Sequence, residues 1–204
     1  MNQQEISFRL VSKEDADELL HIYEPYVLHT AITFEYEVPT RQEFEQRITH
    51  TLENYPYIAA EEKGHIIGYA YAGPLKERKA YDWAVEMTIY VDSSKKRRGI
   101  GKKLYQVLEQ LLKLQGIQNL YACIGYPDKE DEYLTKNSAQ FHEHIGYQLI
   151  GTFHNCGYKF NRWYHMIWME KMIGTHETIP KEFTPFSKIC QSTDVEKILK
   201  GGME

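Results

Sequence analysis

Residues 90–106 read YVDSSKKRRGIGKKLYQ, and the interpretation of the whole chain starts from this stretch. Six basic residues fall within the nine positions 95–103, although the chain of 204 residues has a formal net charge of −5. The stretch lies between an apolar segment at 83–91, typical of a β-strand, and a helical pattern at 100–114. A loop in that position directs backbone N–H groups and the positive end of the helix dipole toward one point. We therefore predict an anion site that fits a phosphate group.

Gly99 and Gly101 make the phosphate interpretation more specific. A side chain at either position would obstruct the approach of a pyrophosphate to the backbone, and the neighbouring Lys and Arg neutralise its charge. The stretch is neither a Walker loop nor the Gly-x-Gly-x-x-Gly of dinucleotide folds, because position 104 is leucine. A solvated basic face or a nucleic-acid patch is the alternative. The negative net charge and the lack of a second basic cluster of this density argue against an extended nucleic-acid groove.

The composition is that of an ordinary globular protein, with 42% hydrophobic and 26% charged residues. No apolar run approaches the roughly 20 residues of a membrane span, and the first ten residues lack the layout of a secretion signal. We expect a cytoplasmic protein with no membrane partner. The three cysteines are odd in number and widely spaced, which favours reduced thiols over a disulfide framework or a zinc site. We therefore expect no metal.

The rest of the chain predicts alternating strands and helices before and after the basic loop, which we define as residues 95–103. After a first strand at 6–11, capping boxes at Ser12 and Thr40 open two helices, and two extended stretches around Lys63-Gly64 predict a hairpin. The later predicted elements are a strand at 119–125, a helix at 138–146 and strands at 147–160 and 162–171. The order β-α-α-β-β-β-α-β-α-β-β predicts an α/β fold with helices on the faces of a mixed sheet. We assign residues 1–172 to one domain and 173–204 to a C-terminal extension packed on it or on a partner.

The segment 96–101, KRRGIG, resembles the coenzyme-A-binding pattern Gln/Arg-x-x-Gly-x-Gly/Ala of the GNAT acyltransferases, with Lys96 where Gln or Arg is usual. Within that superfamily the chain is especially similar to the phosphinothricin and methionine-sulfoximine N-acetyltransferases. The matching segments are TFEYEVPT (33–40), GYAYAGPLKERKAYDWAVEMTIYV (68–91) and HEHIGYQLIGTFHNCGYKFNRW (142–163). The resemblance implies the GNAT fold, a mixed, mostly antiparallel twisted sheet flanked by helices. It also implies acetyl transfer from acetyl-CoA to the amino group of a small amino-acid-like acceptor.

Glu86 is the lone acid in the apolar segment WAVEMTIYV. Acetyl transfer to an amine requires that the substrate ammonium lose its proton, so a carboxylate base near the site is expected. The residues alone also allow an outward-facing or paired strand glutamate, whereas the resemblance implies that Glu86 is the general base, directly or through water. It further implies that His142 assists as a general acid, because the ordinary pKa of histidine, about 6.5, permits donation near neutrality. A plain helix-surface histidine is the alternative for that position.

For the cosubstrate, the resemblance implies contacts from a strand, the basic loop and a later helix. Backbone groups of Ile89, Tyr90 and Val91 would hold the pantetheine arm. Ser138 retains the serine of the family's Asn-x-x-Ser, whereas Thr135 replaces its asparagine. The expected phosphate contacts are Lys96, Arg97, Arg98, Gly99, Ile100, Gly101 and Lys102.

For the acceptor, the resemblance implies a site made of Phe34, Arg78, Tyr81, Lys159 and Trp163. Arg78 is the expected partner of a substrate carboxylate, because its planar guanidinium binds carboxylates through two hydrogen bonds. Lys159 and Trp163 could close the pocket from a neighbouring subunit, since the aromatic terminal strands and the family likeness suggest a homodimer.

Three other functions stay open at this level. Thr135 and His165, the latter standing where family members often have Asp, permit a catalytically weak CoA-binding sensor. Peptide or polyamine acceptors are compatible with the same motif. A nucleic-acid-binding module would use the basic loop and would show steeply salt-dependent binding that CoA does not displace. We expect a small-molecule amine as the partner and no nucleic acid.

Overall fold

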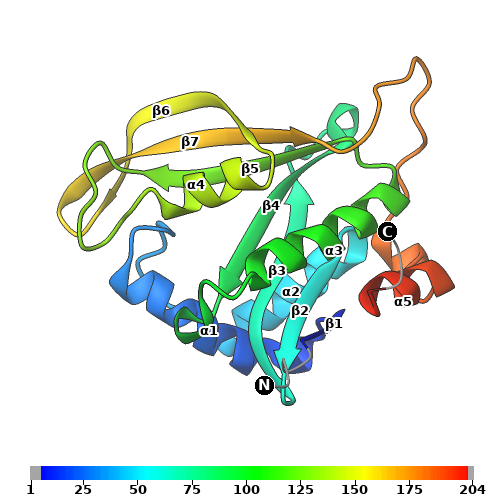
Figure 1. The fold of residues 1–204 in the computed structure, drawn as a ribbon, viewed down its shortest axis with the longest axis horizontal. Helices are drawn as coiled ribbons and strands as arrows, with labels where there is room; N and C mark the ends of the chain where they lie inside the picture. The colour runs from blue at the N-terminus through cyan, green and yellow to red at the C-terminus, as the bar shows by residue number, and fades with distance from the viewer. Residues whose placement is uncertain (1–5, 202–204) are drawn as a thin grey trace.

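A seven-stranded sheet in the order β1-β2-β3-β4-β5-β7-β6 forms the middle of the molecule (Figure 1). The computed structural model describes residues 6–201. The strands are β1 (Ser7–Leu10), β2 (Tyr57–Glu62), β3 (His65–Pro74), β4 (Ala84–Val91), β5 (Asn119–Tyr126), β6 (Gln148–Lys159) and β7 (Arg162–Met172). Among the described strands, β4 and β5 form the one parallel pair. The predicted mixed, mostly antiparallel sheet is therefore confirmed.

The predicted hairpin at Lys63-Gly64 is confirmed, and the predicted terminal strands form a second hairpin; both hairpins turn through two residues with positive φ. Lys63 and Gly64 have φ of 57° and 77° between β2 and β3. Phe160 and Asn161 have φ of 51° and 60° between β6 and β7. Two consecutive positive φ values match the twist of antiparallel strands, which is why such turns join tight hairpins.

The α-helices are α1 (Ala16–His29), α2 (Arg41–Asn54), α3 (Ile100–Gln115), α4 (Asn137–His144) and α5 (Thr193–Leu199). The predicted capping box is present at α2, where the Thr40 hydroxyl accepts from the Glu43 N–H. At Ser12 the box opens a single 3-10 turn, Lys13–Asp15, and α1 follows directly. Gly116 ends α3 with a φ of 91°, a conformation that glycine adopts readily.

Helices α1 and α2 cover one face of the sheet, and α3 and α4 cover the other (Figure 1). Because side chains alternate along a strand, Val85 and Met87 of β4 join the buried cluster beneath α3. Glu86, between them, points to the α1 and α2 side. The carboxylate of Glu86 therefore lies on the face of the sheet opposite to α3, the helix that follows the basic loop.

The segment after β7 packs on the domain itself. It contains a 3-10 turn, Phe186–Lys188, and the helix α5. Phe186, Val195 and Ile198 are at most 1% exposed and belong to the same buried cluster as α3. The boundary between domain and extension at residue 172 stays a prediction. Within residues 6–201, none of the helices has the length and apolarity needed to cross a membrane.

Candidate active site

The parallel strands β4 and β5 separate just after Glu86. Their pairing joins Ala84–Glu86 to Asn119–Tyr121 and goes no further within the described chain. From Met87 onward β4 keeps its partner on the β3 side only, so its other backbone edge is left without a neighbouring strand. The separation of two paired strands creates a cleft whose wall carries free backbone groups.

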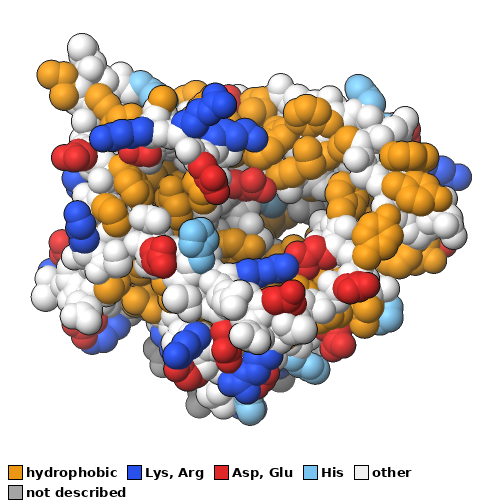
Figure 2. Space-filling model, turned by 180° about the vertical axis from the view of Figure 1, so that it is seen from behind, with side chains coloured by type: hydrophobic (Ala, Val, Ile, Leu, Met, Phe, Trp, Pro, Cys, Tyr) orange, Lys and Arg blue, Asp and Glu red, His pale blue; other side chains and the backbone are white. Residues whose placement is uncertain are grey.

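A cavity of about 230 Å³ occupies this cleft and is lined from both faces of the sheet. Glu86 and Cys123 reach it from the α1 and α2 face, and Tyr105 and His142 reach it from α3 and α4. Seen from behind, the molecule is hollowed near its centre (Figure 2). The cavity therefore allows two reactants to meet from opposite sides of the sheet.

Glu86 lines this cavity without a hydrogen bond or ion pair to another described residue. Burial raises the pKa of its carboxyl group, and the positive charge of Lys76 offsets this only in part. A carboxylate whose charge is poorly solvated takes up a proton more readily than one on the surface. Its position and its pKa thus suit a general base.

His142 is 3% exposed and is held at both ring nitrogens. Its Nδ1 lies 2.7 Å from the carbonyl oxygen of Ser138 and so must carry the proton, which leaves Nε2 to accept from the Tyr105 hydroxyl at 3.2 Å. Burial lowers the pKa of His142 to about 4. This differs from the pKa of about 6.5 expected from the sequence. At neutral pH the imidazole is therefore neutral, and its Nε2 has no proton to donate.

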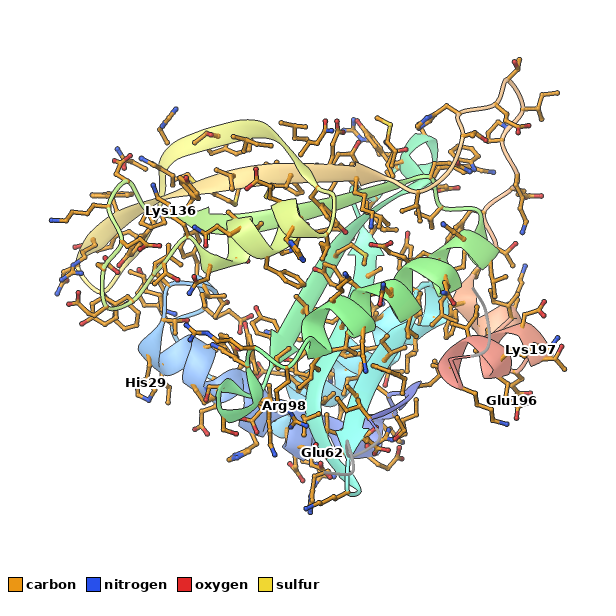
Figure 3. The ribbon with its side chains drawn as sticks, in the orientation of Figure 1. His29, Glu62, Arg98, Lys136, Glu196 and Lys197 are labelled. Atoms are coloured by element: carbon orange, nitrogen blue, oxygen red, sulfur yellow. The ribbon has the colours of Figure 1, made fainter. Side chains whose placement is uncertain are left out.

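The basic loop is partly neutralised by Glu62 at the end of β2. Lys95 lies 3.0 Å from this carboxylate, and the Arg98 guanidinium contacts both of its oxygens (Figure 3). Hydrogen bonds from Arg98 and Lys95 lower the pKa of Glu62 to about 2. The side chain of Arg98 is thus bound to the protein, which differs from the predicted contact with a phosphate.

The other loop residues remain accessible for an anion. Arg97, Lys102 and Gly99 are exposed, and a Cβ at Gly99 would meet no atom within 4 Å. The N-cap Gly99 has a φ of 75° and no side chain caps the first turn of α3. Lys96 is exposed as well and lies 4.9 Å from the centre of the Tyr26 ring.

Gly101 also has a packing role that the sequence did not indicate. A Cβ there would lie 3.2 Å from the Phe141 ring and 3.4 Å from Ile89. Glycine at this position therefore lets α3 pack closely on α4 and β4, and the requirement comes from packing. Ile100, beside it, is buried in the core with 2% exposure, so its contribution to an anion site is limited to its backbone N–H.

The residues predicted to bind the acceptor do not all line the cavity that contains Glu86. Phe34 lines the Glu86 cavity, together with Ile89, Tyr90 and Ser138 of the predicted cosubstrate site. Arg78 and Tyr81 line a neighbouring cavity of about 490 Å³ on the β3–β4 loop. Trp163 is 62% exposed and packs on Tyr158 in the β6–β7 hairpin. Val91, at the end of β4, accepts a hydrogen bond from Tyr26 through its carbonyl oxygen.

Lys159 is buried, and its ammonium group is fully used inside the protein. It donates to the backbone oxygens of Val27, Thr30 and Thr33 at 2.7–2.9 Å. These bonds tie the segment after α1, which carries Phe34, to the end of β6. The ring of Phe34 also lies against Gly157, where a Cβ would overlap it at 2.3 Å. Lys159 is therefore a structural anchor of the cavity wall, in contrast to the substrate contact expected from the sequence.

Sequence reasoning missed Tyr105, whose hydroxyl group links α3 to His142 inside the cavity. Its signal was a polar aromatic residue within the apolar stripe of the helix, next to Leu104. Such a residue is ordinarily read as part of the core. Across residues 6–201, no cluster of three or more His, Cys, Asp or Glu side chains could hold a metal ion.

Comparison with known proteins adds a family to this geometry. The model of the acetyltransferase (GNAT) domain matches residues 8–168. The chain is 34% identical to phosphinothricin N-acetyltransferase of Streptomyces viridochromogenes, covering 78% of this chain and 83% of that protein. It is 26% identical to the L-methionine sulfoximine/L-methionine sulfone acetyltransferase of Salmonella typhimurium, covering 84% and 96%. A phosphinothricin acetyltransferase from Sinorhizobium meliloti, crystallised with AcCoA, superimposes with a TM-score of 0.80 at 30% identity, covering 89% and 97%.

Proposed function

The chain belongs to the GNAT acetyltransferase family, and on that premise we propose that it transfers the acetyl group of acetyl-CoA to a small amino-acid-like acceptor. The acceptor would be of the phosphinothricin or methionine-sulfoximine type, as the names of its relatives suggest. One observation carries the proposal: a carboxylate with a raised pKa, Glu86, faces the cavity at the point where β4 and β5 separate.

Three features of the chain fit acetyl-CoA, which supplies an activated acetyl thioester when bound. The free edge of β4 from Met87 to Val91 offers backbone groups to an extended amide-containing arm. The uncapped start of α3 and the exposed Arg97 and Lys102 suit phosphates. The open space at Gly99 allows close approach to the backbone. Because Glu62 already binds Lys95 and Arg98, backbone N–H groups would contribute more to phosphate binding than the count of basic residues suggests.

Glu86 would act as the general base, directly or through one water molecule. Above its raised pKa it is ionised and can accept a proton from the ammonium group of the acceptor, which then attacks as a neutral amine. A base whose pKa lies closer to neutrality than an ordinary glutamate performs this transfer more effectively.

His142 would assist through Tyr105. The hydrogen bond from the Tyr105 hydroxyl to Nε2 fixes that hydroxyl at the wall of the cavity, on the side of α3 and α4. When that hydroxyl turns its hydrogen from Nε2 toward the cavity, Tyr105 is the candidate hydrogen-bond donor to the departing sulfur, and His142 is a positioning residue. This assignment replaces the general-acid role, because a histidine with a pKa of about 4 carries no donor proton on Nε2 at neutral pH.

The acceptor's carboxylate would bind the β3–β4 loop. Lys76, Arg78 and Tyr81 line the cavity of about 490 Å³ there. Lys76 also influences the pKa of Glu86, so the loop lies within electrostatic range of the base. Two cations beside a carboxylate base suit a ligand that carries one amino and one carboxylate group.

We also propose a homodimer formed through β6. This strand is at the edge of the sheet, and its Leu149, Ile150 and Phe153 are 49–60% exposed. Exposed apolar residues on an unpaired edge favour association with another chain. Analytical ultracentrifugation is expected to give a dimer, and Phe153→Asp should shift it toward the monomer. A wild-type monomer at micromolar concentration would contradict this part of the proposal.

We propose a cytoplasmic location because the three cysteines are free thiols. Cys123, Cys156 and Cys190 are all free, and Cys156 is exposed. Exposed thiols persist in reducing compartments and tend to oxidise outside them. Cell fractionation tests the location, and recovery of the protein outside the cytoplasm would contradict it.

The test of the function is a thiol-release assay with acetyl-CoA and a panel of amines. The panel contains phosphinothricin, methionine sulfoximine, common amino acids, a polyamine and a short peptide. Amine-dependent release of CoA with one of the amino-acid-like acceptors is expected. Tight binding of acetyl-CoA without turnover on any amine would indicate a sensor. Binding to DNA or RNA that acetyl-CoA does not displace would indicate the nucleic-acid function.

A further inference from the structure

A second cavity, of about 290 Å³, lies beside the Glu86 cavity. Its walls come from the β3–β4 loop, the first residues of β5 and the C-terminal extension. The residues that matter here are Tyr81, Trp83, Tyr121, His176, Glu177 and Pro180. These segments are far apart in the sequence, and only the folded chain brings them together.

The register of the strands places the two cavities next to each other on one face of the sheet. Ala84 and Glu86 are two residues apart on β4, so their side chains share a face, and the same holds for Tyr121 and Cys123 on β5. Ala84 and Tyr121 line the second cavity, whereas Glu86 and Cys123 line the first. Two residues along a strand correspond to roughly 7 Å, so one amino-acid-sized ligand can reach both cavities.

Hydrogen bonds hold the outer wall of the second cavity in place. The indole N–H of Trp83 donates to the Lys181 carbonyl oxygen at 2.7 Å, and His176 lies 2.7 Å from the side-chain oxygen of Asn119. The ammonium of Lys181 donates to the carbonyl oxygen of Leu114 at 2.9 Å. In Figure 1 the segment after β7 leaves the sheet beside the β3–β4 loop. The wall is therefore a formed part of the fold.

The chemistry of the second cavity is mainly aromatic and apolar. Tyr81, Trp83 and Tyr121 supply ring surfaces, and Trp83 has already used its one polar hydrogen on Lys181. Four polar residues also line it: His176 and Glu177 are exposed and belong to the rim, whereas Gln118 and Asn119 are half-buried. The Asn119 side chain bonds to His176 and to the Tyr121 hydroxyl, and the Gln118 amide donates to the Gly116 carbonyl oxygen. Half-buried rings with a polar rim are the usual surroundings of an aromatic or large apolar group.

We propose that the second cavity is a subsite for the acceptor's side chain, and that it lets the protein use amino acids with an aromatic or large apolar side chain in addition to acceptors of the phosphinothricin type. This rests on the proposed acetyl transfer. With the amine at Glu86 and the carboxylate toward Arg78, the side chain would point past Tyr81, which lines both the Arg78 cavity and the second cavity. The family match ends at residue 168, so the wall from His176 to Pro180 lies outside the part of the chain that defines the family.

The kinetic test compares L-phenylalanine with L-alanine as acceptors. The wild-type kcat/KM is expected to be at least about 10-fold higher for phenylalanine, in line with what hydrophobic pockets achieve. The double variant His176→Ala/Pro180→Ala removes side chains from the wall, and it should lower kcat/KM for phenylalanine about 10-fold. Values for alanine and the KM for acetyl-CoA should stay unchanged. Lys197→Ala, on α5 away from the cavity, is the matched control and should behave as wild type (Figure 3).

A binding measurement separates failure of the subsite from failure of the proposed function. N-acetyl-L-phenylalanine should bind the wild type more tightly than N-acetyl-L-alanine in calorimetry, and the double variant should lose this difference. If no amine is acetylated but the difference is present, the acetyl transfer fails and the cavity still binds aromatic side chains. If alanine and phenylalanine give equal kcat/KM, or if their N-acetyl derivatives bind equally, the subsite is overturned. Thermal unfolding of each variant verifies that it is folded.

Discussion

Two strand glutamates of this protein, Glu86 and Glu62, occupy opposite electrostatic environments. Glu86 lines the cleft between β4 and β5, where burial raises the pKa of its carboxyl group. Glu62 is 5% exposed at its side chain and binds both Lys95 and Arg98, which lower its pKa to about 2. The Glu86 carboxylate is thus available for proton transfer, whereas the Glu62 carboxylate holds the basic loop in place. Residue type alone does not distinguish them, because the partners decide the role.

The same distinction applies to the cations. The buried ammonium group of Lys159 donates hydrogen bonds to three backbone carbonyl oxygens, whereas the side chain of Arg97 in the basic loop is exposed. A charged group whose hydrogen bonds are already satisfied inside the protein stabilises structure, and a group without such partners can bind a ligand. The four predictions below test this division, from the largest expected effect to the smallest.

The largest effect is expected from Glu86→Gln. Loss of the base should lower kcat about 10²–10⁴-fold at neutral pH while acetyl-CoA binding is retained. The folded pKa of Glu86 lies above its unfolded value, so ionised Glu86 destabilises the fold as pH rises through that range. Glu86→Gln should therefore unfold at the same or a higher temperature at pH 7. In the wild type, kcat/KM should fall as pH drops through the raised pKa of Glu86. Steady-state kinetics and calorimetry measure these effects.

The matched control is Glu170→Gln, which alters another strand glutamate outside the cavity. It should leave turnover unchanged. Normal turnover in Glu86→Gln would remove Glu86 from the mechanism and with it the contrast between the two glutamates.

The second largest effect is expected from Lys159→Met. Three buried carbonyl oxygens lose their donor, which should lower the free energy of unfolding by about 1–3 kcal/mol. The segment that carries Phe34 would loosen, so KM for the acceptor should rise about 10-fold, with acetyl-CoA binding little affected. Denaturant unfolding and steady-state kinetics test both, with the exposed Lys188→Met as control. Unchanged stability with loss of acceptor binding alone would restore Lys159 as a substrate contact.

Tyr105→Phe tests the hydrogen bond to His142. Loss of the hydroxyl should lower kcat about 10-fold, which corresponds to one hydrogen bond, while KM changes little. Tyr147→Phe is the control, because the neighbouring Tyr147 hydroxyl is buried without a hydrogen-bond partner in the described structure. Because His142 has a pKa of about 4, the wild-type pH profile should lack a histidine limb near neutrality. Such a limb, abolished by His142→Gln, would return His142 to the general-acid role.

The smallest effect on turnover is expected from Glu62→Gln. The loop would lose its anchor, so KM for acetyl-CoA should rise by a factor of about 3, with kcat unchanged. The folded pKa of Glu62 lies below its unfolded value, so its stabilisation is complete above about pH 4.5 and is lost as pH falls toward 2. The variant should be less stable at pH 7 and should have a flatter acid profile. Thermal unfolding against pH measures this, and Glu24→Gln, at an exposed position of α1, should leave the profile unchanged.

Much of the fold could be predicted because its determinants are local. Helical spacing, capping residues and the turn at Lys63-Gly64 act within a few positions of each other. The elements of the extension could not be predicted, since Phe186 and Val195 are separated by irregular chain and pack in a cluster built from distant elements, α3 among them. The unexpected anchoring of Arg98 by Glu62 has the same cause, because the two residues are 36 positions apart.

By itself, the sequence determined the order of strands and helices, the loop that precedes α3 and Glu86 as the lone acid of an apolar strand. These features depend on periodicity and on residues that are adjacent in the chain. Only the tertiary structure decided that β4 and β5 separate after Glu86, that Glu62 and Lys159 are used internally, and that the extension closes a second cavity. Each of these depends on which distant groups meet and satisfy one another's charge and hydrogen bonds, and sequence patterns do not encode that directly.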